Sequence, residues 1–403
     1  MSFALRTVYR GTELLLGASA WPQGVARAAV AWDASPSLLS LVFAALEEDG
    51  ELALLNTRLT DAERAAQLAA LGLSKNASGV HFFEGEKRDP SLLLFTSGTT
   101  GAPKAAVLPL QSLLASARAA NQVLGIDAQS RFVCAMPLFH VGGLGIAFRC
   151  ALASATMVLH TRFDACAVAE ELLHGATHAS LVAATLARVL DQGARFPKTV
   201  RAVAVGGGPV PKPLLDRARE AGLPVVQTYG LTESCSMATC ERPDDADGET
   251  AGPPMPGMSV RIENGEILLR GPQLMRGYDG QPPLRGEFAT GDLGELDARG
   301  RLVVHARRTD LIVSGGENVY PAEVEAALLL HPAVREAAVV PMPDERWGQV
   351  GVAFVVTSAS ESELRAHLEK RLAKYKIPAR FEAVSELPRL PSGKPDRRKL
   401  RRF

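Results

Sequence analysis

LLLFTSGTTGAPKAAVLP, residues 92–109, is an apolar run that leads into a small, polar, glycine-rich segment and then a lysine. The apolar residues predict a buried strand, and the small residues after it leave backbone N–H groups and hydroxyls unhindered. Such a segment is either a plain turn or a cradle for phosphate oxygens, to which Lys104 would add positive charge. The residues that would surround the phosphates are Thr96, Ser97, Gly98, Thr99, Thr100 and Gly101.

The spacing of this segment differs from that of a Walker P-loop, in which GxxxxG leads directly into Lys and a hydroxyl residue. Lys104 is instead followed by AAVLP, which predicts a short strand rather than the phosphate-facing helix of a P-loop. We therefore interpret residues 96–104 as a mobile flap that covers a triphosphate.

The composition indicates an ordinary globular protein. The 403 residues are 47% hydrophobic and 22% charged, and this length predicts two or three domains or subdomains. Lys plus Arg and Asp plus Glu both number 44, so the net charge gives no reason to expect a nucleic-acid or membrane partner. The five cysteines have no CxxC spacing, which argues against a disulfide framework and against a zinc site.

Two features predict a cytoplasmic protein without a membrane span. The N-terminus does not have the pattern of a signal peptide. The most apolar region, residues 132–159, is interrupted by Pro137, His140 and Arg149, which argues against a spanning helix.

The fold class that we predict is α/β. Strand and helix patterns alternate from about residue 38 to 240, which is typical of doubly wound, mostly parallel sheets. A β-rich section of about 250–306 follows, with hairpins that turn near Gly265 and Gly300. We expect a large N-terminal domain, residues 1–308, that includes this β-rich subdomain, and a small mobile α+β C-terminal domain, residues 309–403.

The string TSGTTGAPK, residues 96–104, resembles the signature of acyl-adenylate-forming enzymes. Five further segments follow in the order of that superfamily, which includes acyl-CoA synthetases, luciferases and peptide-synthetase adenylation modules. Any one of them alone is an ordinary turn or helix cap, but the order of all six identifies the chain as similar to this superfamily from about Leu38 to the C-terminus. The five segments are GGGPVP at 206–211, TYGLTES at 228–234, TGDLGELD at 290–297, HARRTDLIVSGGENVYPAEVE at 305–325 and PRLPSGKPDRRKL at 388–400.

For the middle of the chain, the resemblance implies a site for adenine, phosphate and magnesium. Tyr229 would stack on adenine, Thr232 would donate a hydrogen bond to the α-phosphate, and Glu233 would coordinate Mg²⁺. Attack of a carboxylate on phosphorus brings two anions together, so a metal ion and fixed donors must neutralise charge. The turn residues assigned to the nucleotide are Gly206, Gly207, Gly208, Pro209 and Gly230.

For the C-terminal third, the resemblance implies ribose contacts and a catalytic lysine. Asp292 would accept hydrogen bonds from both ribose hydroxyls, and Arg307 would contact ribose. Lys394 would bridge the substrate carboxylate and the α-phosphate during adenylation. The alternative is a solvated or RNA-binding basic tail, which would not explain the Pro-Ser-Gly before Lys394.

The predicted hinge departs from the common pattern of the superfamily. Thr309 follows two residues after Arg307, at a position where most members have Asp or Lys. This context, together with GGGPVPKPLL and LAKYKIPARF, is similar to the o-succinylbenzoate–CoA ligases of menaquinone synthesis. The C-terminal domain would turn about Thr309 after adenylation and withdraw Lys394. The backbone of Gly315 and Gly316 would then line the path of the CoA thiol.

The acid substrate is marked less clearly. His140 lies in MPLFHVGGLG, a turn that borders the acyl pocket in the superfamily, although a lone histidine is more often a packed or capping residue. The resemblance favours o-succinylbenzoate, an aromatic keto diacid, and leaves other aryl or medium-chain acids open. Further pocket candidates follow the YGLTE segment, namely Ser234, Cys235, Ser236 and Met237.

The predicted function is an ATP-dependent acid–CoA ligase that works through an acyl-adenylate. It would use ATP, Mg²⁺, CoA and a small carboxylic acid, without a nucleic-acid partner, and its oligomeric state stays open. A stand-alone adenylation enzyme that loads a carrier protein is the first alternative. The second is a non-catalytic nucleotide-binding protein, against which the polar residues of the five segments argue.

Overall fold

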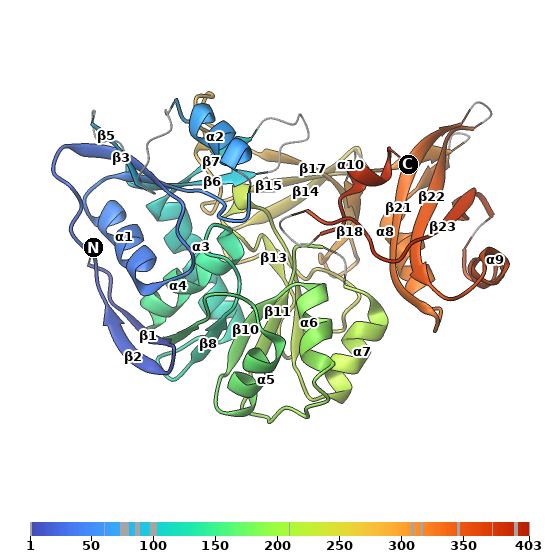
Figure 1. Cartoon of the computed structure of the whole chain (residues 1–403), viewed down its shortest axis with the longest axis horizontal. Coiled ribbons are helices and arrows are strands. Elements are labelled where there is room, and N and C mark those ends of the chain that lie inside the picture. The colour runs from blue at the N-terminus through green and yellow to red at the C-terminus, as the bar shows by residue number, and fades with distance from the viewer. Residues whose placement is uncertain are drawn as a thin grey trace.

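The described strands form four sheets, of eight, six, four and five strands. The computed structural model of the chain describes residues 2–59, 61–72, 80–84, 89–96, 103–208, 210–307, 310–314, 317–344, 347–372, 374–390 and 394–402. Figure 1 shows a small C-terminal unit (orange to red) beside a larger part that contains the other three sheets.

The largest sheet has a parallel centre with an antiparallel strand at each edge. Parallel strands are covered on both faces, which agrees with continuous apolar runs such as AVAV in β11. In order across the sheet, its strands are β13 (Thr239–Cys240), β12 (Val225–Tyr229), β11 (Ala202–Val205), β10 (His178–Leu181), β8 (Arg131–Cys134), β9 (Thr156–Leu159), β1 (Leu5–Tyr9) and β2 (Thr12–Leu16).

Helices cover both faces of this sheet, as predicted for a doubly wound arrangement. Along β8, Phe132 and Cys134 pack into one core cluster and Val133 into another, because successive side chains of a strand point to opposite faces. The first cluster includes residues of α1 (Pro36–Glu47), α3 (Leu110–Leu124) and α4 (Val141–Ala153). The second includes α5 (Ala165–Leu173), α6 (Ala183–Leu190) and α7 (Lys212–Glu220).

The six-stranded sheet contains most of the stretch 92–109, as strands β6 and β7. β6 pairs antiparallel with β7, and Thr96 at the end of β6 lies opposite Lys104 at the start of β7. The prediction of a strand after Lys104 is therefore confirmed. The strands in order are β16 (Gly277–Tyr278), β7 (Lys104–Pro109), β6 (Ser91–Thr96), β4 (Glu51–Leu54), β3 (Val25–Val30) and β5 (Val80–Glu84), and α2 spans Asp61–Ala70.

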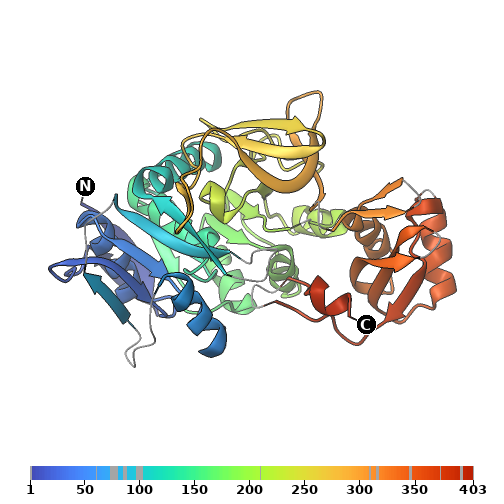
Figure 2. The same ribbon diagram turned by 90° about the horizontal axis from the view of Figure 1, so that it is seen from above.

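The β-rich section forms the four-stranded sheet, which lies above the other elements in Figure 2. The predicted hairpin near Gly265 is confirmed, since Asn264 and Gly265 have φ values of 51° and 78°. Two successive residues with positive φ make the tight turn that matches the twist of the flanking strands. The strands in order are β14 (Ser259–Glu263), β15 (Glu266–Arg270), β17 (Phe288–Leu296) and β18 (Leu302–Arg307).

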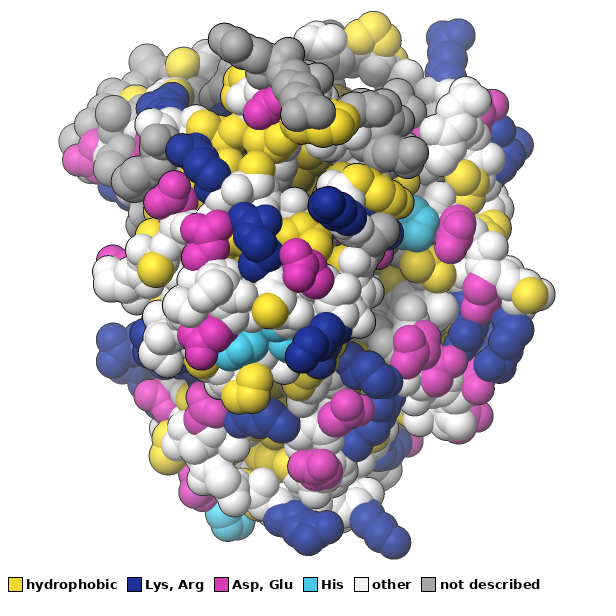
Figure 3. Space-filling model, turned by 90° about the vertical axis from the view of Figure 1, so that its right-hand side faces the viewer, with side chains coloured by type: hydrophobic (Ala, Val, Ile, Leu, Met, Phe, Trp, Pro, Cys, Tyr) yellow, Lys and Arg dark blue, Asp and Glu magenta, His cyan; other side chains and the backbone are white. Residues whose placement is uncertain are grey.

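The C-terminal unit has a five-stranded sheet and core clusters of its own. Its face in Figure 3 carries acidic and basic side chains interspersed. The elements are β19 (Ile312–Ser314), β20 (Glu317–Val319), α8 (Pro321–Leu329), β21 (Val334–Asp344), β22 (Gly348–Thr357), α9 (Glu361–Glu369), η2 (Lys374–Lys376), β23 (Arg380–Ala383) and α10 (Arg397–Leu400).

The predicted α/β class, with a large N-terminal part and a smaller C-terminal one, is confirmed by this arrangement. The boundary at residues 308 and 309 and the mobility of the C-terminal unit stay predictions, because both residues lie outside the described part of the chain. Of the helices that the structure describes, none has both the length and the apolar character needed to cross a bilayer.

His178 on β10 is a titratable group held fully inside the eight-stranded sheet. Its Nε2 lies 2.9 Å from the carbonyl oxygen of Leu124, and its Nδ1 lies 2.8 Å from Oγ1 of Thr177. Nε2–H therefore donates to the carbonyl, and in the neutral ring Nδ1 can accept from the hydroxyl. Burial lowers the pKa of His178 to about 4.

We expect the free energy of unfolding to fall as the pH is lowered from 7 to 5. In the unfolded chain His178 takes up its proton near the ordinary pKa of 6.5, whereas in the folded chain it stays neutral down to about 4. The unfolded state thus binds more protons in this window, and His178 contributes a loss of about 2 kcal/mol at pH 5. Urea unfolding of wild type, His178→Gln and the exposed-site control His174→Gln measures it. Equal pH slopes in wild type and His178→Gln would contradict the assignment.

Candidate active site

Two loops predicted to bind nucleotide leave neighbouring parallel strands at the same edge of the large sheet. Gly206, Gly207 and Gly208 follow β11, and Gly230 follows β12. A Cβ on Gly206 would lie 2.4 Å from Oγ1 of Thr228, so this close approach requires glycine. The carboxyl edge of parallel strands is where open α/β sheets bind ligands.

The structure brings the predicted adenine and ribose residues together. The hydroxyl of Tyr229, at the end of β12, donates to Oδ2 of Asp292 on β17 at 2.8 Å. Asp292 is 6% exposed and lies opposite Arg307 of β18 in the strand register. Three residues from different predicted segments thus meet where the eight-stranded and four-stranded sheets adjoin.

The residues predicted to handle magnesium and phosphate also converge. Thr232 begins the 3₁₀ turn η1 (Thr232–Ser234), and Glu233 within it is 7% exposed. The hydroxyl of Tyr278 on β16 donates to Oε1 of Glu233 at 2.7 Å. Nζ of Lys104 lies 5.5 Å from the centroid of the same tyrosine ring. Tyr278 therefore contacts Lys104 through its ring and Glu233 through its hydroxyl.

Glu233 has the chemistry of a magnesium ligand in a nucleotide site. Mg²⁺ bound with nucleotides takes one or two carboxylates and completes its shell with phosphate oxygens and water. Within the described part of the chain, no group of three or more His, Cys, Asp or Glu gathers to make an all-protein metal site. One buried carboxylate beside a phosphate-binding segment fits a metal ion that arrives with ATP.

Lys394 reaches the same region from the C-terminal unit. A Cβ on Gly207 would lie 3.9 Å from Cε of Lys394. The last segment of the chain extends from the C-terminal unit toward the larger part, as Figure 2 shows. The structure thus places Lys394 beside the glycine turn that follows β11.

The segment that carries Lys394 is tied to the C-terminal unit by ion pairs. Arg397 donates to both carboxylate oxygens of Glu325 on α8, at 2.7 and 2.9 Å. Arg401 donates to Oδ1 of Asp310 at 2.8 Å. Asp396 caps α10 by accepting from backbone N–H groups of its first turn. These contacts tie the segment that carries Lys394 to the C-terminal unit.

His140 stands at the start of α4, close to two positive charges. Burial, together with the charges of Arg58 and Lys394, lowers the pKa of His140 to about 4. The ring is neutral at pH 7, and its Nε2 has no hydrogen-bond partner among the described residues. A buried nitrogen without a partner is costly and is therefore suited to a substrate oxygen. Its role toward an acid stays a prediction.

The other candidates for the acyl pocket differ in their hydrogen bonds. The hydroxyl of Ser234 is bonded within its own loop, to Leu231 and Ser236, and the carbonyl of Cys235 accepts from Ser116. Ser234, Cys235 and Met237 are all buried. The hydroxyl of Ser236 instead accepts from Nη2 of Arg149 at 3.2 Å.

Arg149 on α4 was not predicted as a site residue. It is 1% exposed, and its Nε and Nη1 have no hydrogen-bond partner among the described residues. Burial lowers the pKa of Arg149 to about 10, so it stays charged at pH 7. A buried charge without a counter-ion costs several kcal/mol. The signal in the sequence was a single arginine within the apolar run VGGLGIAFRCALA, which we interpreted only as an interruption.

Some predicted site residues lie outside the described part of the chain. They are Ser97, Gly98, Thr99, Thr100, Gly101, Pro209, Thr309, Gly315 and Gly316. Thr96 and Lys104, which border the phosphate segment, are described and pair across β6 and β7.

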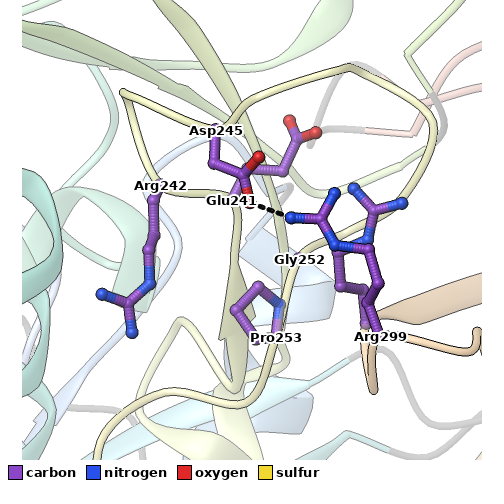
Figure 4. A pocket seen from close by; sticks show the side chains of 7 residues that line it. Glu241, Arg242, Asp245, Gly252, Pro253 and Arg299 are labelled. Atoms are coloured by element: carbon purple, nitrogen blue, oxygen red, sulfur yellow. Dashed lines mark hydrogen bonds and ion pairs between the residues drawn. The ribbon is translucent and has the colours of Figure 1, made fainter.

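None of the predicted site residues that the structure describes lines a separate pocket of about 100 Å³ (Figure 4). Arg299 and Asp245 form an ion pair across it at 2.6 Å, and Glu241 accepts from the backbone N–H of Gln227. Arg301 pairs with Asp247 and Asp297 beside the pocket, so we interpret it as a structural contact between a loop and the β17–β18 turn. The lining residues are Glu241, Arg242, Asp245, Gly252, Pro253, Arg299 and Arg301.

Comparisons with known proteins match most of the chain. Residues 72–279 match the family model described as AMP-binding enzyme, and residues 323–394 match its C-terminal domain. The chain is 38% identical over 423 residues to the 2-succinylbenzoate–CoA ligase of Bacillus velezensis, which covers 93% of this chain and 87% of that relative. It is 41% identical over 330 residues to the ligase of that name from Bacillus subtilis, covering 77% of this chain and 68% of the relative.

Solved structures agree with these matches. The o-succinylbenzoate CoA synthetase (MenE) from Bacillus subtilis, in complex with the acyl-adenylate OSB-AMP, has a TM-score of 0.87 and 33% identity, and the match covers 98% of this chain and 95% of that one. The same synthetase in complex with ATP and a magnesium ion has a TM-score of 0.85 and 32% identity, over 99% and 96% of the two chains.

Proposed function

The chain belongs to the AMP-binding enzyme family, and we propose that it is an ATP-dependent 2-succinylbenzoate–CoA ligase that serves menaquinone biosynthesis. In the first step, a carboxylate oxygen of the acid bonds to the α-phosphorus of ATP and pyrophosphate leaves. In the second, the thiol of CoA loses its proton and bonds to the acyl carbon, and AMP leaves. The matches to curated ligases and to a synthetase that holds ATP, magnesium or an acyl-adenylate support both steps.

The polar residues that converge would have different roles in the first step. Lys394 and Lys104 supply positive charge to the reacting carboxylate and the phosphates, which lowers the cost of bringing two anions together. Glu233 would hold a magnesium ion, which when bound neutralises phosphate charge. Thr232 would donate a hydrogen bond to the α-phosphate.

The nucleotide would be held at the other end by Tyr229 and Asp292. The ring of Tyr229 stacks on adenine, while its hydroxyl fixes the carboxylate of Asp292 through the 2.8 Å hydrogen bond. Asp292 then accepts from the ribose hydroxyls, and Arg307, which is opposite in the register, contacts ribose. The backbone of Gly206 to Gly208 and of Gly230 would lie against the base.

The observation that carries the choice of acid is the buried charge of Arg149, which has no ion pair within the described part of the chain. 2-Succinylbenzoate has two carboxylates, and only one is activated, so the other must be neutralised within the pocket. Arg149 offers a guanidinium beside Ser236 whose Nε and Nη1 bond no described residue. Guanidinium is the group best suited to bind a carboxylate with two parallel hydrogen bonds. The neutral His140 would add a donor or acceptor at the other end of α4.

Exchange of labelled pyrophosphate into ATP tests this function. We expect exchange with 2-succinylbenzoate to have a kcat/KM at least about a hundredfold above that with benzoate, which has no second carboxylate. Mass spectrometry should then detect 2-succinylbenzoyl-CoA when CoA is added. Equal exchange with benzoate or octanoate would contradict the diacid, and no exchange with any acid would contradict the enzyme. A thioester formed only on a pantetheinylated carrier protein would favour the adenylation-module alternative.

We further propose residues 1–308 and 309–403 as the two domains, with Thr309 as the hinge and Gly315 and Gly316 on the thiol path. The C-terminal unit supports this division with a sheet and core of its own. A cytoplasmic location, where ATP and CoA are available, and the absence of a nucleic-acid partner belong to the same proposal. The equal numbers of basic and acidic residues, 44 each, support the latter.

A further inference from the structure

Tyr278 lies on a two-residue strand, β16, and the residues just before and just after this strand form backbone hydrogen bonds to β7. The N–H of Arg276 donates to the carbonyl of Val107 at 2.9 Å, and the N–H of Asp279 donates to the carbonyl of Ala105 at 2.8 Å. β16 thereby forms the edge of the six-stranded sheet, next to the strand that begins at Lys104.

Ion pairs hold the residues on either side of Tyr278 to the interior of that sheet. Arg276 bonds Oε1 of Glu51 at 2.8 Å, and Asp279 bonds Arg27 at 2.8 and 2.9 Å. Arg27 also bonds Glu51, which is 1% exposed. Because β3, β4 and β16 share this network, the backbone at Tyr278 has little freedom to shift.

The side chain of Tyr278 contacts both charged groups of the phosphate site. Its hydroxyl donates to Oε1 of Glu233 at 2.7 Å, and Nζ of Lys104 lies 5.5 Å from the ring centroid. Glu233 has no other side-chain hydrogen bond within the described part of the chain, so this hydroxyl sets the direction of its carboxylate. The ring face attracts the ammonium group of Lys104.

We propose that Tyr278 is a positioning residue that aims Glu233 at the metal ion and holds Lys104 beside the phosphates. This inference rests on the proposed function, in which Glu233 holds Mg²⁺. With Oε1 bonded to the tyrosine, Oε2 would be the oxygen offered to a metal ion. Groups that hydrogen-bond a metal ligand fix its orientation, and their removal weakens metal affinity about 10- to 100-fold.

Two variants separate the roles of the hydroxyl and the ring. Tyr278→Phe removes only the hydroxyl and should raise the dissociation constant of Mn²⁺ about 10- to 100-fold, measured by EPR titration with α,β-methylene-ATP present. Its affinity for the analogue without metal should stay unchanged. Tyr278→Leu also removes the ring face and should weaken metal-free binding of the analogue about two- to fivefold, which corresponds to the strength of an exposed cation–π contact.

Tyr9→Phe is the matched control, because it removes a tyrosine hydroxyl on β1, near the opposite edge of the eight-stranded sheet from β12. It should leave both affinities as in wild type. A Tyr278→Phe enzyme that binds Mn²⁺ like wild type, even with a lowered melting temperature, would show a purely structural tyrosine and overturn the inference. If wild type itself binds the analogue without any metal dependence, the metal role of Glu233 is wrong and the inference falls with it.

Discussion

Replacing Lys394 by alanine should slow formation of the acyl-adenylate by at least about a hundredfold, because one lost charge contact in this transition state is worth a few kcal/mol. Conversion of a supplied acyl-adenylate to the CoA thioester should stay within about threefold of wild type, since Lys394 would have left the site by then. Pyrophosphate exchange measures the first step, and single-turnover thioester formation from synthetic adenylate measures the second.

The structure explains why the two steps separate. Lys394 lies beside the Gly207 turn of the larger part, but Arg397 and Glu325 tie its segment to the C-terminal unit. In the cycle that we propose, rotation of that unit about Thr309 would withdraw the lysine without unfolding its segment. In the proposed cycle, the same rotation brings the backbone of Gly315 and Gly316 to the thiol path.

Lys399→Ala is the matched control for this prediction. Lys399 is an exposed lysine on α10, five residues after Lys394. Its removal should leave both steps unchanged, which separates the catalytic lysine from a general effect of positive charge in the tail. A Lys394→Ala enzyme that loses the same factor in both steps would rule out the alternating-domain account.

Replacing Arg149 by methionine should lower kcat/KM for 2-succinylbenzoate by about a hundredfold or more, because a buried carboxylate would lose its charged partner, worth about 2–5 kcal/mol. The KM for ATP should change little, since Arg149 contacts Ser236 rather than the nucleotide residues. Exchange with benzoate should also change little, because benzoate has no second carboxylate to lose a partner.

The same substitution should not destabilise the protein. Arg149 is 1% exposed, and no described Asp or Glu compensates its charge. Methionine of similar length removes that cost, and the free energy of unfolding should rise or stay equal. The substitution would thus lower the activity without lowering the stability, as is typical of a residue kept for function.

Urea unfolding and steady-state kinetics on Arg149→Met and on Arg162→Met test this pair of effects. Arg162 is exposed, in the loop after β9, and its replacement should alter neither quantity. A proportionate loss of exchange with both 2-succinylbenzoate and benzoate would point to a damaged pocket. A marked drop in stability would show that Arg149 is a structural residue, and the choice of a diacid would lose its main support.

Local features of the chain were readable because neighbouring residues determine them. The hairpin at Asn264 and Gly265 follows from two residues that accept positive φ, and the strand after Lys104 follows from an apolar run that ends at α3. The order of short polar segments likewise pointed to the family and to Tyr229, Glu233 and Asp292. The hairpin and the strand are determined by a few neighbouring residues, whereas the family is indicated by the order of the segments along the chain.

Contacts between distant residues were not readable. Tyr278 bonds Glu233 across 45 positions, and Arg149 bonds Ser236 across 87. A tyrosine in RGYDG or an arginine in an apolar helix looks like an ordinary strand or an interruption until the fold supplies its partner. The sequence by itself determined the class of fold, the family and the residue types available for Mg-ATP chemistry. Only the tertiary structure decided which of those groups are paired, because pairing and burial depend on sheets and helices brought together from far apart in the chain.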